Sequence, residues 1–267
     1  MMETEQSLRL SIFFGVLLTV ALWELIAPKR ALTVKKSQRW LSNFAISFLN
    51  IALLRLLFPI AAGGAAVLAA EQQWGLFNSL GLPFWLAFVV GFVLLDLLIY
   101  WQHRIFHRVP LLWRLHRMHH MDLDIDVSTG IRFHPLEALL SMAIKVLAIV
   151  VLGVPVEAVL LFEVVLNATA MFNHGNIALP HAVDRWLRLV MVTPDMHRVH
   201  HSVIATETHS NFGFNLPWWD RLFGSYRAQP RDGHDKMTIG LARYRSPNQS
   251  SKLGAMLLHP FRKESNR

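Results

Sequence analysis

The sequence predicts an all-α integral membrane protein with about three to five membrane helices and a histidine-rich helical cap on the cytosolic side. Two observations predict this fold class. Hydrophobic residues make up 53% of the 267 residues and gather in four blocks, each as long as the roughly twenty residues that span a bilayer as a helix. Histidines at helical spacing follow these blocks, so we expect membrane helices that carry a polar centre at one end.

The first three blocks predict three membrane helices. Their ranges are residues 8–28, 45–70 and 77–101. The first follows Glu3 and Glu5, where a signal peptide would be basic, so we expect it to be retained as a membrane helix. The second contains Pro59 and a Gly-Gly pair, which predict a kink. The third ends in Tyr100-Trp101, an aromatic pair typical of the membrane interface.

The fourth block, residues 136–172, is long enough for two segments. Gly153-Val154-Pro155 predicts a break between them, so we expect a membrane hairpin that either crosses the bilayer or enters it shallowly. From residue 173 onward the chain is more polar. We therefore divide it into N-terminal membrane helices, a histidine-rich region that includes the hairpin, and a basic cytosolic tail: residues 1–100, 101–230 and 231–267.

The charges of the loops orient these helices. Residues 28–44 carry five basic residues and no acidic one, whereas residues 71–82 carry Glu71 and no basic residue. The positive-inside rule places the first loop in the cytoplasm and the second outside. All histidine clusters then reach the cytoplasmic face of a multi-pass protein, in a bacterial inner membrane or an ER-like membrane.

The composition excludes several classes of site. The chain has no Cys, which rules out disulfides, thiolate metal sites and Cys-ligated iron–sulfur clusters. The net charge of +8 comes with no recognisable nucleic-acid-binding module, so we expect no nucleic-acid partner. Basic residues beside apolar blocks are typical of a membrane surface. Any metal must therefore be held by nitrogen and oxygen ligands.

Three histidine clusters predict a metal centre. Two have the pattern HxxHH and a third has HxxxH. On a helix such positions share one face, so each HxxHH is expected to aim three imidazoles at a common point. One HxxHH arises by chance in about one such chain in thirty, and two far more rarely. Eight imidazoles exceed what one catalytic ion can take, so we expect two ions. The eight residues are His103, His107, His116, His119, His120, His197, His200 and His201.

Further motifs surround these clusters, between about Asp96 and Tyr226. They are HRxxH at 103–107, LWRLHRMHH at 112–120, RFHPLE at 132–137, NHGN at 173–176, TPDMHRVHH at 193–201 and SNFGFNLPWWDRLFGSY at 210–226. In this order they resemble the fatty acid hydroxylase/sterol desaturase superfamily. Members are integral membrane oxygenases in which a histidine-bound di-iron centre activates O2 against lipid C–H bonds.

The resemblance implies that the eight clustered histidines are metal ligands, and it adds His174 as a ninth. It implies two iron ions, which zinc can replace in isolated protein, with O2 as co-substrate. It also implies a fatty acyl or sterol-like lipid substrate. We expect an external electron donor such as a ferredoxin or cytochrome, because the chain has no nucleotide, haem or iron–sulfur motif.

Four residues are candidates for supporting roles around the ligands. Asp96 stands in an apolar block two helical turns before His103, so we expect it to orient a ligand histidine; a hydrogen bond between helices is the alternative. For His134 we weigh a ligand or supporting role against structural hydrogen bonding. Asp195 and Asn211 are similar candidates.

The remaining titratable residues carry weaker signals. His209 stands where the family often has an acidic residue, so we assign it no metal role. His181, His234 and His259 are expected to be ordinary. Glu163, in an apolar block, is expected to face a substrate passage or to pair with a basic residue.

These observations predict a membrane-bound, O2-dependent lipid hydroxylase or desaturase. Two alternatives stay open. The same fold can support non-oxygenase metal chemistry as a lyase, isomerase or hydrolase, although no Glu stands beside the HxxHH motifs as a hydrolytic base. A membrane metal transporter or sensor is the other, although its ligands would be expected near the bilayer midplane rather than past the ends of the helices.

Overall fold

The structure, a computed structural model, describes residues 2–262, with side chains from residue 7 onward. Within this range all regular elements are helices, and pairing between extended segments is limited to two isolated bridges. The predicted all-α class is confirmed.

Long helices form the first two thirds of the chain. Their bounds are α1 Met2–Ile26, α2 Lys36–Leu57, α3 Ala61–Glu71, α5 Phe84–Arg108, α6 Pro110–His120, α7 Pro135–Leu152 and α8 Val156–Asn173, with the short α4 Leu76–Ser79 and η1 Val127–Ile131. Five segments of the described chain are long and apolar enough to cross a membrane: residues 7–26, 36–79, 84–108, 135–152 and 156–173. The protein is therefore a multi-pass membrane protein, as predicted.

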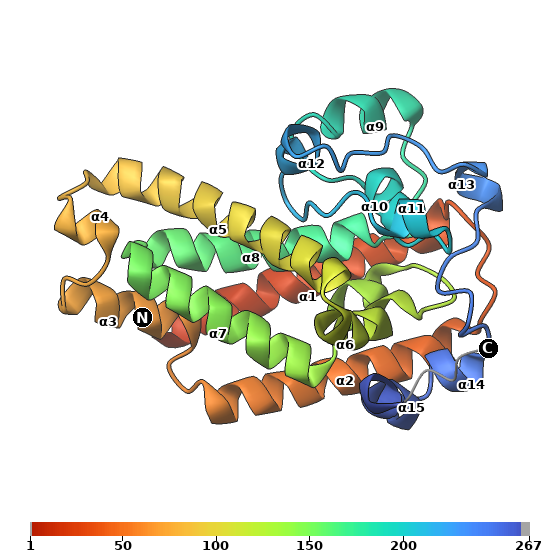
Figure 1. The fold of residues 1–267 in the computed structure, drawn as a ribbon, viewed down its shortest axis with the longest axis horizontal. Helices are drawn as coiled ribbons and strands as arrows, with labels where there is room; N and C mark the ends of the chain where they lie inside the picture. Colours follow the sequence, from red (N-terminus) through yellow and green to blue (C-terminus); the bar gives the residue numbers. More distant parts are fainter. Residues whose placement is uncertain (1, 263–267) are drawn as a thin grey trace.

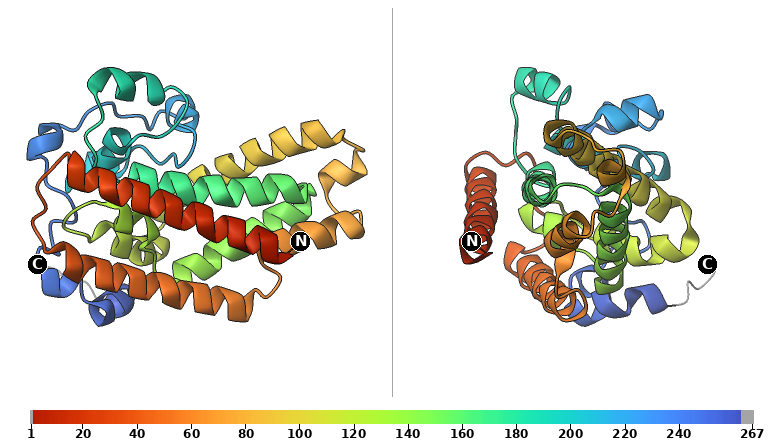
Figure 2. Two further views of the ribbon diagram at one scale, coloured as in Figure 1. Left: turned by 180° about the vertical axis from the view of Figure 1, so that it is seen from behind. Right: turned by 90° about the vertical axis from the view of Figure 1, so that its left-hand side faces the viewer.

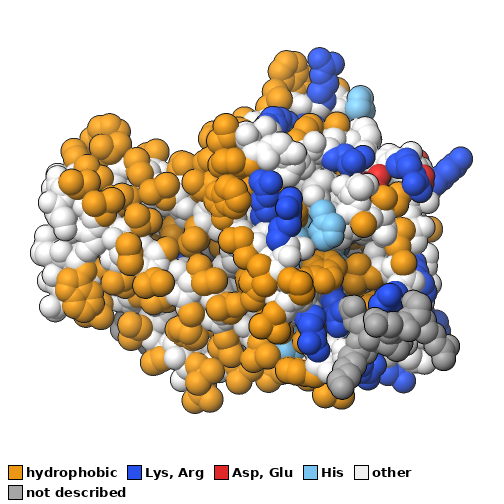
Figure 3. Space-filling view, in the orientation of Figure 1, with side chains coloured by type: hydrophobic (Ala, Val, Ile, Leu, Met, Phe, Trp, Pro, Cys, Tyr) orange, Lys and Arg blue, Asp and Glu red, His pale blue; other side chains and the backbone are white. Residues whose placement is uncertain are grey.

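The long helices lie side by side along the longest axis of the molecule (Figure 1). The start of α1 lies at the same end as α3, while α6 and the later short helices lie at the other end, and α1 and α8 are neighbours in both lengthwise views (Figures 1 and 2). In four of the five candidate spans fewer than a third of the residues are buried in the protein. The exposed remainder is largely apolar (Figure 3), as expected for a surface covered by lipid.

Two helix boundaries differ from the prediction. The predicted second helix is two helices, because the chain breaks at Phe58–Ile60 around Pro59, and α2 begins earlier than expected. The predicted third helix starts later, after Pro83, and continues to Arg108 because no helix breaker stands at Trp101. As a result His103 and His107 lie inside the last turns of α5 rather than beyond a membrane helix.

The α7–α8 hairpin breaks at the predicted position. Gly153 has a positive φ of 70°, which ends α7 in a left-handed residue, and Pro155 precedes the first residue of α8. The core between α5 and α8 is apolar, with Leu95 and Phe162 fully buried. This packing aligns the ends of α5 and α8 at the same level.

The remainder of the described chain is a cap of short helices and loops. The helices are α9 His181–Leu187, α10 Pro194–His200, α11 Ala205–Thr208, α12 Trp218–Leu222, α13 Gly233–Lys236, α14 Pro247–Ser250, α15 Leu253–Leu258 and η2 His259–Phe261. In Figure 1 the helices α9 to α13 lie beside the ends of α5 and α8, whereas α14 and α15 lie beside α2.

Candidate metal centre

The nine histidines expected as ligands come together in two buried groups. In each group the candidate ligand atoms all lie within 4.8 Å of one another. The five-histidine group consists of His103, His107, His116, His120 and His200. The four-histidine group consists of His119, His174, His197 and His201.

Both HxxHH motifs divide between the two groups, and the expectation that each motif aims at one point is wrong. In α6, His116 and His120 join the five-histidine group while His119 joins the other. In the second motif only His200 joins the five-histidine group, and His197 and His201 join the four-histidine group. Successive helical residues point about 100° apart, so the adjacent histidines of a motif cannot face the same point. Each motif therefore links both groups.

Hydrogen bonds on the outer side of the groups select the tautomer that five of these rings have when neutral. In each, Nδ1 lies within 3.0 Å of an oxygen that can only accept, so Nδ1 carries the proton and Nε2 carries the lone pair. The pairs are His103 with Phe212 O (2.8 Å), His116 with Glu137 Oε1 (2.6 Å), His119 with Arg132 O (3.0 Å), His174 with Ala170 O (2.6 Å) and His200 with Ser210 O (2.7 Å).

The unprotonated nitrogens face one another inside each group. His103 Nε2 lies 3.1 Å from His116 Nε2, and His119 Nε2 lies 3.1 Å from His174 Nε2. Two lone pairs at this distance repel each other unless a cation lies between them. Nε2 of His200 is also buried without a hydrogen-bond partner. The residues present therefore fit a metal ion in each group.

Burial keeps six of the rings outside the membrane segments neutral. It lowers the pKa of five of them well below the usual range: His119, His120, His197, His200 and His201. It lowers the pKa of His174 to about 4. Metal binding requires the neutral imidazole, so no deprotonation is needed near neutral pH.

Aromatic side chains enclose both groups. Phe133 stacks on the His119 ring with centroids 4.7 Å apart, and Trp113 lies 4.8 Å from the His107 ring. Phe212 contacts His103, with ring centroids 5.5 Å apart. Such walls exclude water and lower the local dielectric around the rings.

The fatty acid hydroxylase family model matches residues 88–225, just over half of the chain and the segment that holds all nine histidines. The chain belongs to the fatty acid hydroxylase family. The predicted resemblance is confirmed.

Several relatives of this chain are enzymes that oxidise lipids. It is 27% identical to the ornithine lipid hydroxylase of Rhizobium tropici, over 82% of this chain and 67% of the relative. It is 29% identical to the alkylglycerol monooxygenase of Homo sapiens, over 57% of this chain and 32% of the relative. It is 23% identical to a Delta(7)-sterol 5(6)-desaturase of Aspergillus fumigatus, over 69% and 60% of the two chains. The chain thus spans between a third and two thirds of these relatives. No solved structure matches it.

Asp96 does not contact a ligand histidine, so that expectation is wrong. Its Oδ2 accepts hydrogen bonds from Trp219 Nε1 (2.8 Å) and from the Leu216 backbone (3.3 Å). Two helical turns separate Asp96 from His103 by about 10 Å, which is too far for a direct contact. Asp96 instead holds the loop whose Phe212 carbonyl receives the His103 ring.

His134 caps a helix and does not join either group. Its Nδ1 accepts from the Leu136 backbone (3.2 Å), and its Nε2 donates to the Leu257 carbonyl (3.2 Å). This is the structural role weighed for it. Three other residues of the RFHPLE motif contact candidate ligand histidines: Glu137 accepts from His116, the Arg132 carbonyl accepts from His119, and Phe133 stacks on the His119 ring. No role was predicted for these three residues.

Asp195 and Asn211 also act away from the rings. Asp195 forms an ion pair with Arg198 of the cap and lies 3.6 Å from Nζ of Lys29, in the loop between α1 and α2, so it faces basic side chains rather than the rings. Asn211 has a φ of 52° and donates from Nδ2 to the Met196 carbonyl (2.8 Å). It therefore holds the residue that precedes His197.

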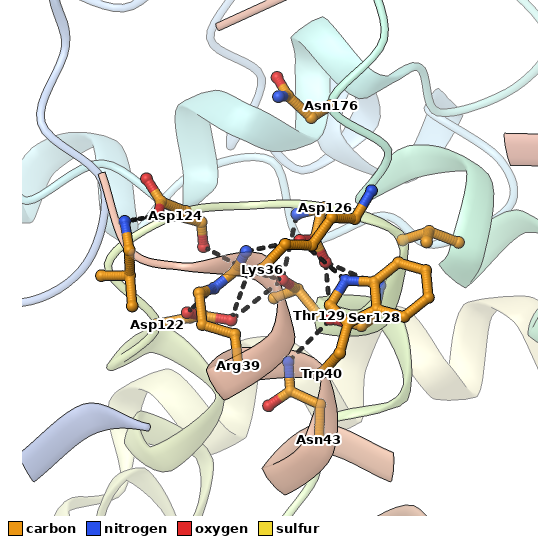
Figure 4. A network of polar contacts seen from close by, with 12 residues as sticks. Lys36, Arg39, Trp40, Asn43, Asp122, Asp124, Asp126, Ser128, Thr129 and Asn176 are labelled. Carbon is orange, nitrogen blue, oxygen red and sulfur yellow. Dashed lines mark hydrogen bonds and ion pairs between the residues drawn. The ribbon is translucent and has the colours of Figure 1, made fainter. Parts of the chain in front are cut away.

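A buried charge network missed by the sequence reasoning supports the loop after α6 (Figure 4). Arg39 of α2 donates through Nε and Nη2 to the two oxygens of Asp122 at 2.7 and 2.8 Å, and it also pairs with Asp126. Burial alone would raise the pKa of Asp122, but the charges of Arg39 and Arg132 outweigh it and lower that pKa to about 2. The loop ends in Arg132, whose carbonyl receives the His119 ring.

The remaining titratable residues have defined partners or lie outside the groups. Glu163 pairs with Arg9 and Lys145, which is one of its two expected roles. His181 is exposed. His209, to which no metal role was assigned, lies with Nδ1 3.3 Å from His107 Nδ1.

Proposed function

We propose that this chain is a membrane-bound, O2-dependent lipid oxygenase, a hydroxylase or desaturase, that holds two iron ions in the two histidine groups. The observation that carries the proposal is the pair of buried groups whose unprotonated Nε2 atoms face each other at 3.1 Å. The names of the relatives, which are hydroxylase, monooxygenase and desaturase, support oxygen chemistry over hydrolysis.

Iron suits this donor set. Imidazole nitrogen binds iron, zinc and copper, and the chain offers no thiolate that would favour another centre. Two bound iron ions would supply the activation of O2 that an unactivated lipid C–H bond requires, because no base can remove a proton from such a carbon.

The residues of the chain would hold and orient these ions. Five rings are kept in one tautomer by buried acceptors, and the Glu137 carboxylate makes the His116 ring more basic than a backbone carbonyl would. Phe133 and Phe212 keep water from the rings. A dry, rigid site favours oxidation of a bound lipid over side reactions with water.

The position of the groups supports a lipid substrate. His103 and His107 belong to α5, a candidate membrane span, so the five-histidine group is continuous with the lipid-covered part of the molecule. A fatty acyl or sterol-like lipid would enter from the bilayer with its tail toward the rings. The ornithine lipid, alkylglycerol and sterol in the relatives' names belong to the same broad class.

The histidine end is proposed to face the cytoplasm. Arg30, in the basic loop between α1 and α2, donates to the Met237 carbonyl of the cap at 2.6 Å, so this loop and the cap lie at the same end. Basic loops favour the cytoplasmic side. Lys and Arg side chains gather on this end (Figure 3), where a ferredoxin or cytochrome would dock to deliver electrons.

The decisive experiment compares membrane lipids made with and without the active chain. The chain, a double variant His119→Ala/His200→Ala that removes one ring from each group, and a His181→Ala control at an exposed histidine are expressed in the same membranes. We expect the wild type and control to add one oxygen atom to a lipid, or to remove two hydrogens, only when O2 is present. Unchanged lipids with both ions bound would instead indicate non-oxygenase metal chemistry.

A further inference from the structure

His209 stands at the boundary between the five-histidine group and the surface. Its Nδ1 lies 3.3 Å from Nδ1 of His107, and the two rings meet edge to face at 90° with centroids 5.4 Å apart. The His209 ring also packs near Trp113, with centroids 5.9 Å apart. His209 itself is exposed, whereas His107 is buried.

The contact differs from the other outer contacts of the ligand histidines. In the five other outer contacts that the structure shows, Nδ1 of the histidine donates to a buried backbone carbonyl or to the buried carboxylate of Glu137. Only a movement of the main chain or a change in the core could alter those contacts. The contact to His107 comes instead from a solvent-exposed side chain, so a single substitution at residue 209 can change it without disturbing the core.

The buried Nε2 atom of His107 determines which atom of the His107–His209 contact is the donor. Nε2 of His107 is buried and has no hydrogen-bond partner among the described residues, as a ligand atom would be. If Nε2 is to bind a cation it must carry the lone pair, so the proton of the neutral ring lies on Nδ1. His107 Nδ1–H then donates to Nδ1 of His209, which accepts.

We propose that His209 is a positioning residue for the metal held by the five-histidine group: it accepts the outer N–H of His107, fixes the tautomer of that ring and aims its Nε2 inward. The proposal rests on the two-ion function proposed above. Outer partners of metal-bound histidines typically change metal affinity or activity by 10–100-fold when removed. His209 is thus a sixth outer partner, beside the five described above, and it is one that the protein exposes to solvent.

The test measures metal release from the purified full chain loaded with Zn²⁺. Four variants are compared with the wild type: His209→Ala, which removes the acceptor; His209→Asn and His209→Asp, which restore an oxygen acceptor; and His181→Ala, a matched exposed histidine on α9. Release to a chelator is followed for each of the two ions. Thermal unfolding of the metal-free variants checks that the fold is kept.

We expect His209→Ala to release one ion about 10–100-fold faster and to leave the other unchanged. The Asn and Asp variants and the His181→Ala control should behave like the wild type. Equal release from His209→Ala and wild type would overturn the proposal. The proposal would also be overturned if His209→Ala and His209→Asn both lost one ion while His209→Asp retained it, because that pattern is expected when residue 209 is itself a metal ligand.

The measurement separates this inference from the proposed function. A wild-type chain that retains both ions and oxidises no lipid would refute the oxygenase assignment and leave the His209 contact supported by the release rates. A wild-type chain that binds no metal would refute both.

Discussion

His119 and His120 are adjacent in α6, yet their rings stand at 90° to each other and belong to different histidine groups. The second motif repeats this division with His200 and His201. Both groups thus depend on both motifs, which explains why one HxxHH alone could not form either of them. The consequence is that neighbouring substitutions should have different effects on metal content.

Substitution of either residue should remove metal from a different group. We expect His119→Ala to lose the ion of the four-histidine group and His120→Ala to lose the ion of the five-histidine group, because each removes one ring from its group. Metal per chain, measured by elemental analysis, should fall from two to about one in each, and lipid oxidation should stop in both. His181→Ala should keep both ions. Complete loss of metal in both variants would show that the two groups do not bind independently.

Glu137 should tune the metal held through His116. Its carboxylate accepts from His116 Nδ1 at 2.6 Å in a buried site. Glu137→Ala is expected to lower metal affinity or activity by 10–100-fold, and Glu137→Gln, which keeps an oxygen acceptor, should lose less. Competition with a chelator gives the affinity. The exposed Glu157 of α8 provides the control Glu157→Gln, and equal affinities for Glu137→Ala and this control would contradict the role.

Arg39 should be required for stability. It is fully buried and pairs with Asp122 and Asp126. Arg39→Met leaves these carboxylates buried without their cation, which costs about 3–5 kcal/mol of unfolding free energy. Thermal or denaturant unfolding in detergent measures the loss. Arg55→Met, at an exposed position of the same helix, should be nearly neutral, and a similarly small loss at Arg39 would rule out the network as a stabilising element.

Acid should destabilise the metal-free protein. Burial lowers the pKa of His174 to about 4, below its ordinary value near 6.5. The unfolded chain therefore binds a proton that the folded chain excludes, and stability falls as the pH drops from about 6.5 towards 4. The midpoint of thermal unfolding, followed over this range without metal, should decrease steadily. A midpoint that stays constant or rises between these values would contradict the buried, neutral ring.

Acid should also release the metal over the same range, because protons and metal compete for the same nitrogen. Metal-loaded protein should stay folded to a lower pH than metal-free protein. The difference between their unfolding midpoints as a function of pH reports the free energy of metal binding.

The helices and eight of the nine candidate ligands followed from local patterns, and this is why they could be predicted. A run of apolar residues needs no partner to specify a membrane helix, and the breaks at Pro59 and Gly153 come from the backbone preferences of those residues. Helix ends were less accurate, because α5 continues through His103 and His107 where no helix breaker stops it.

The outer partners could not be predicted in the same way. Four of the five fixed rings donate to backbone carbonyls, and every residue type offers such an oxygen, so the sequence contains no signal for them. Asp96 was expected to orient a histidine because a buried carboxylate suggests function, but its partner proved to be the loop around Trp219. Arg39 and Asp122 lie 83 residues apart, and only folding brings them into contact.

The sequence by itself determined that the chain is helical, that it enters the membrane, and that nine histidines are suited to bind metal. The helices and eight of these histidines follow from composition and from spacing along single helices, and the ninth, His174, follows from the resemblance to the family. Only the tertiary structure decided how the nine rings divide into five and four, which acceptors fix five of the rings, and that His209 meets His107. The reason is geometric. The position of a residue in its helix determines the direction in which its side chain points, but whether the side chains of two helices meet depends on how α5, α6, α8 and α10 pack together.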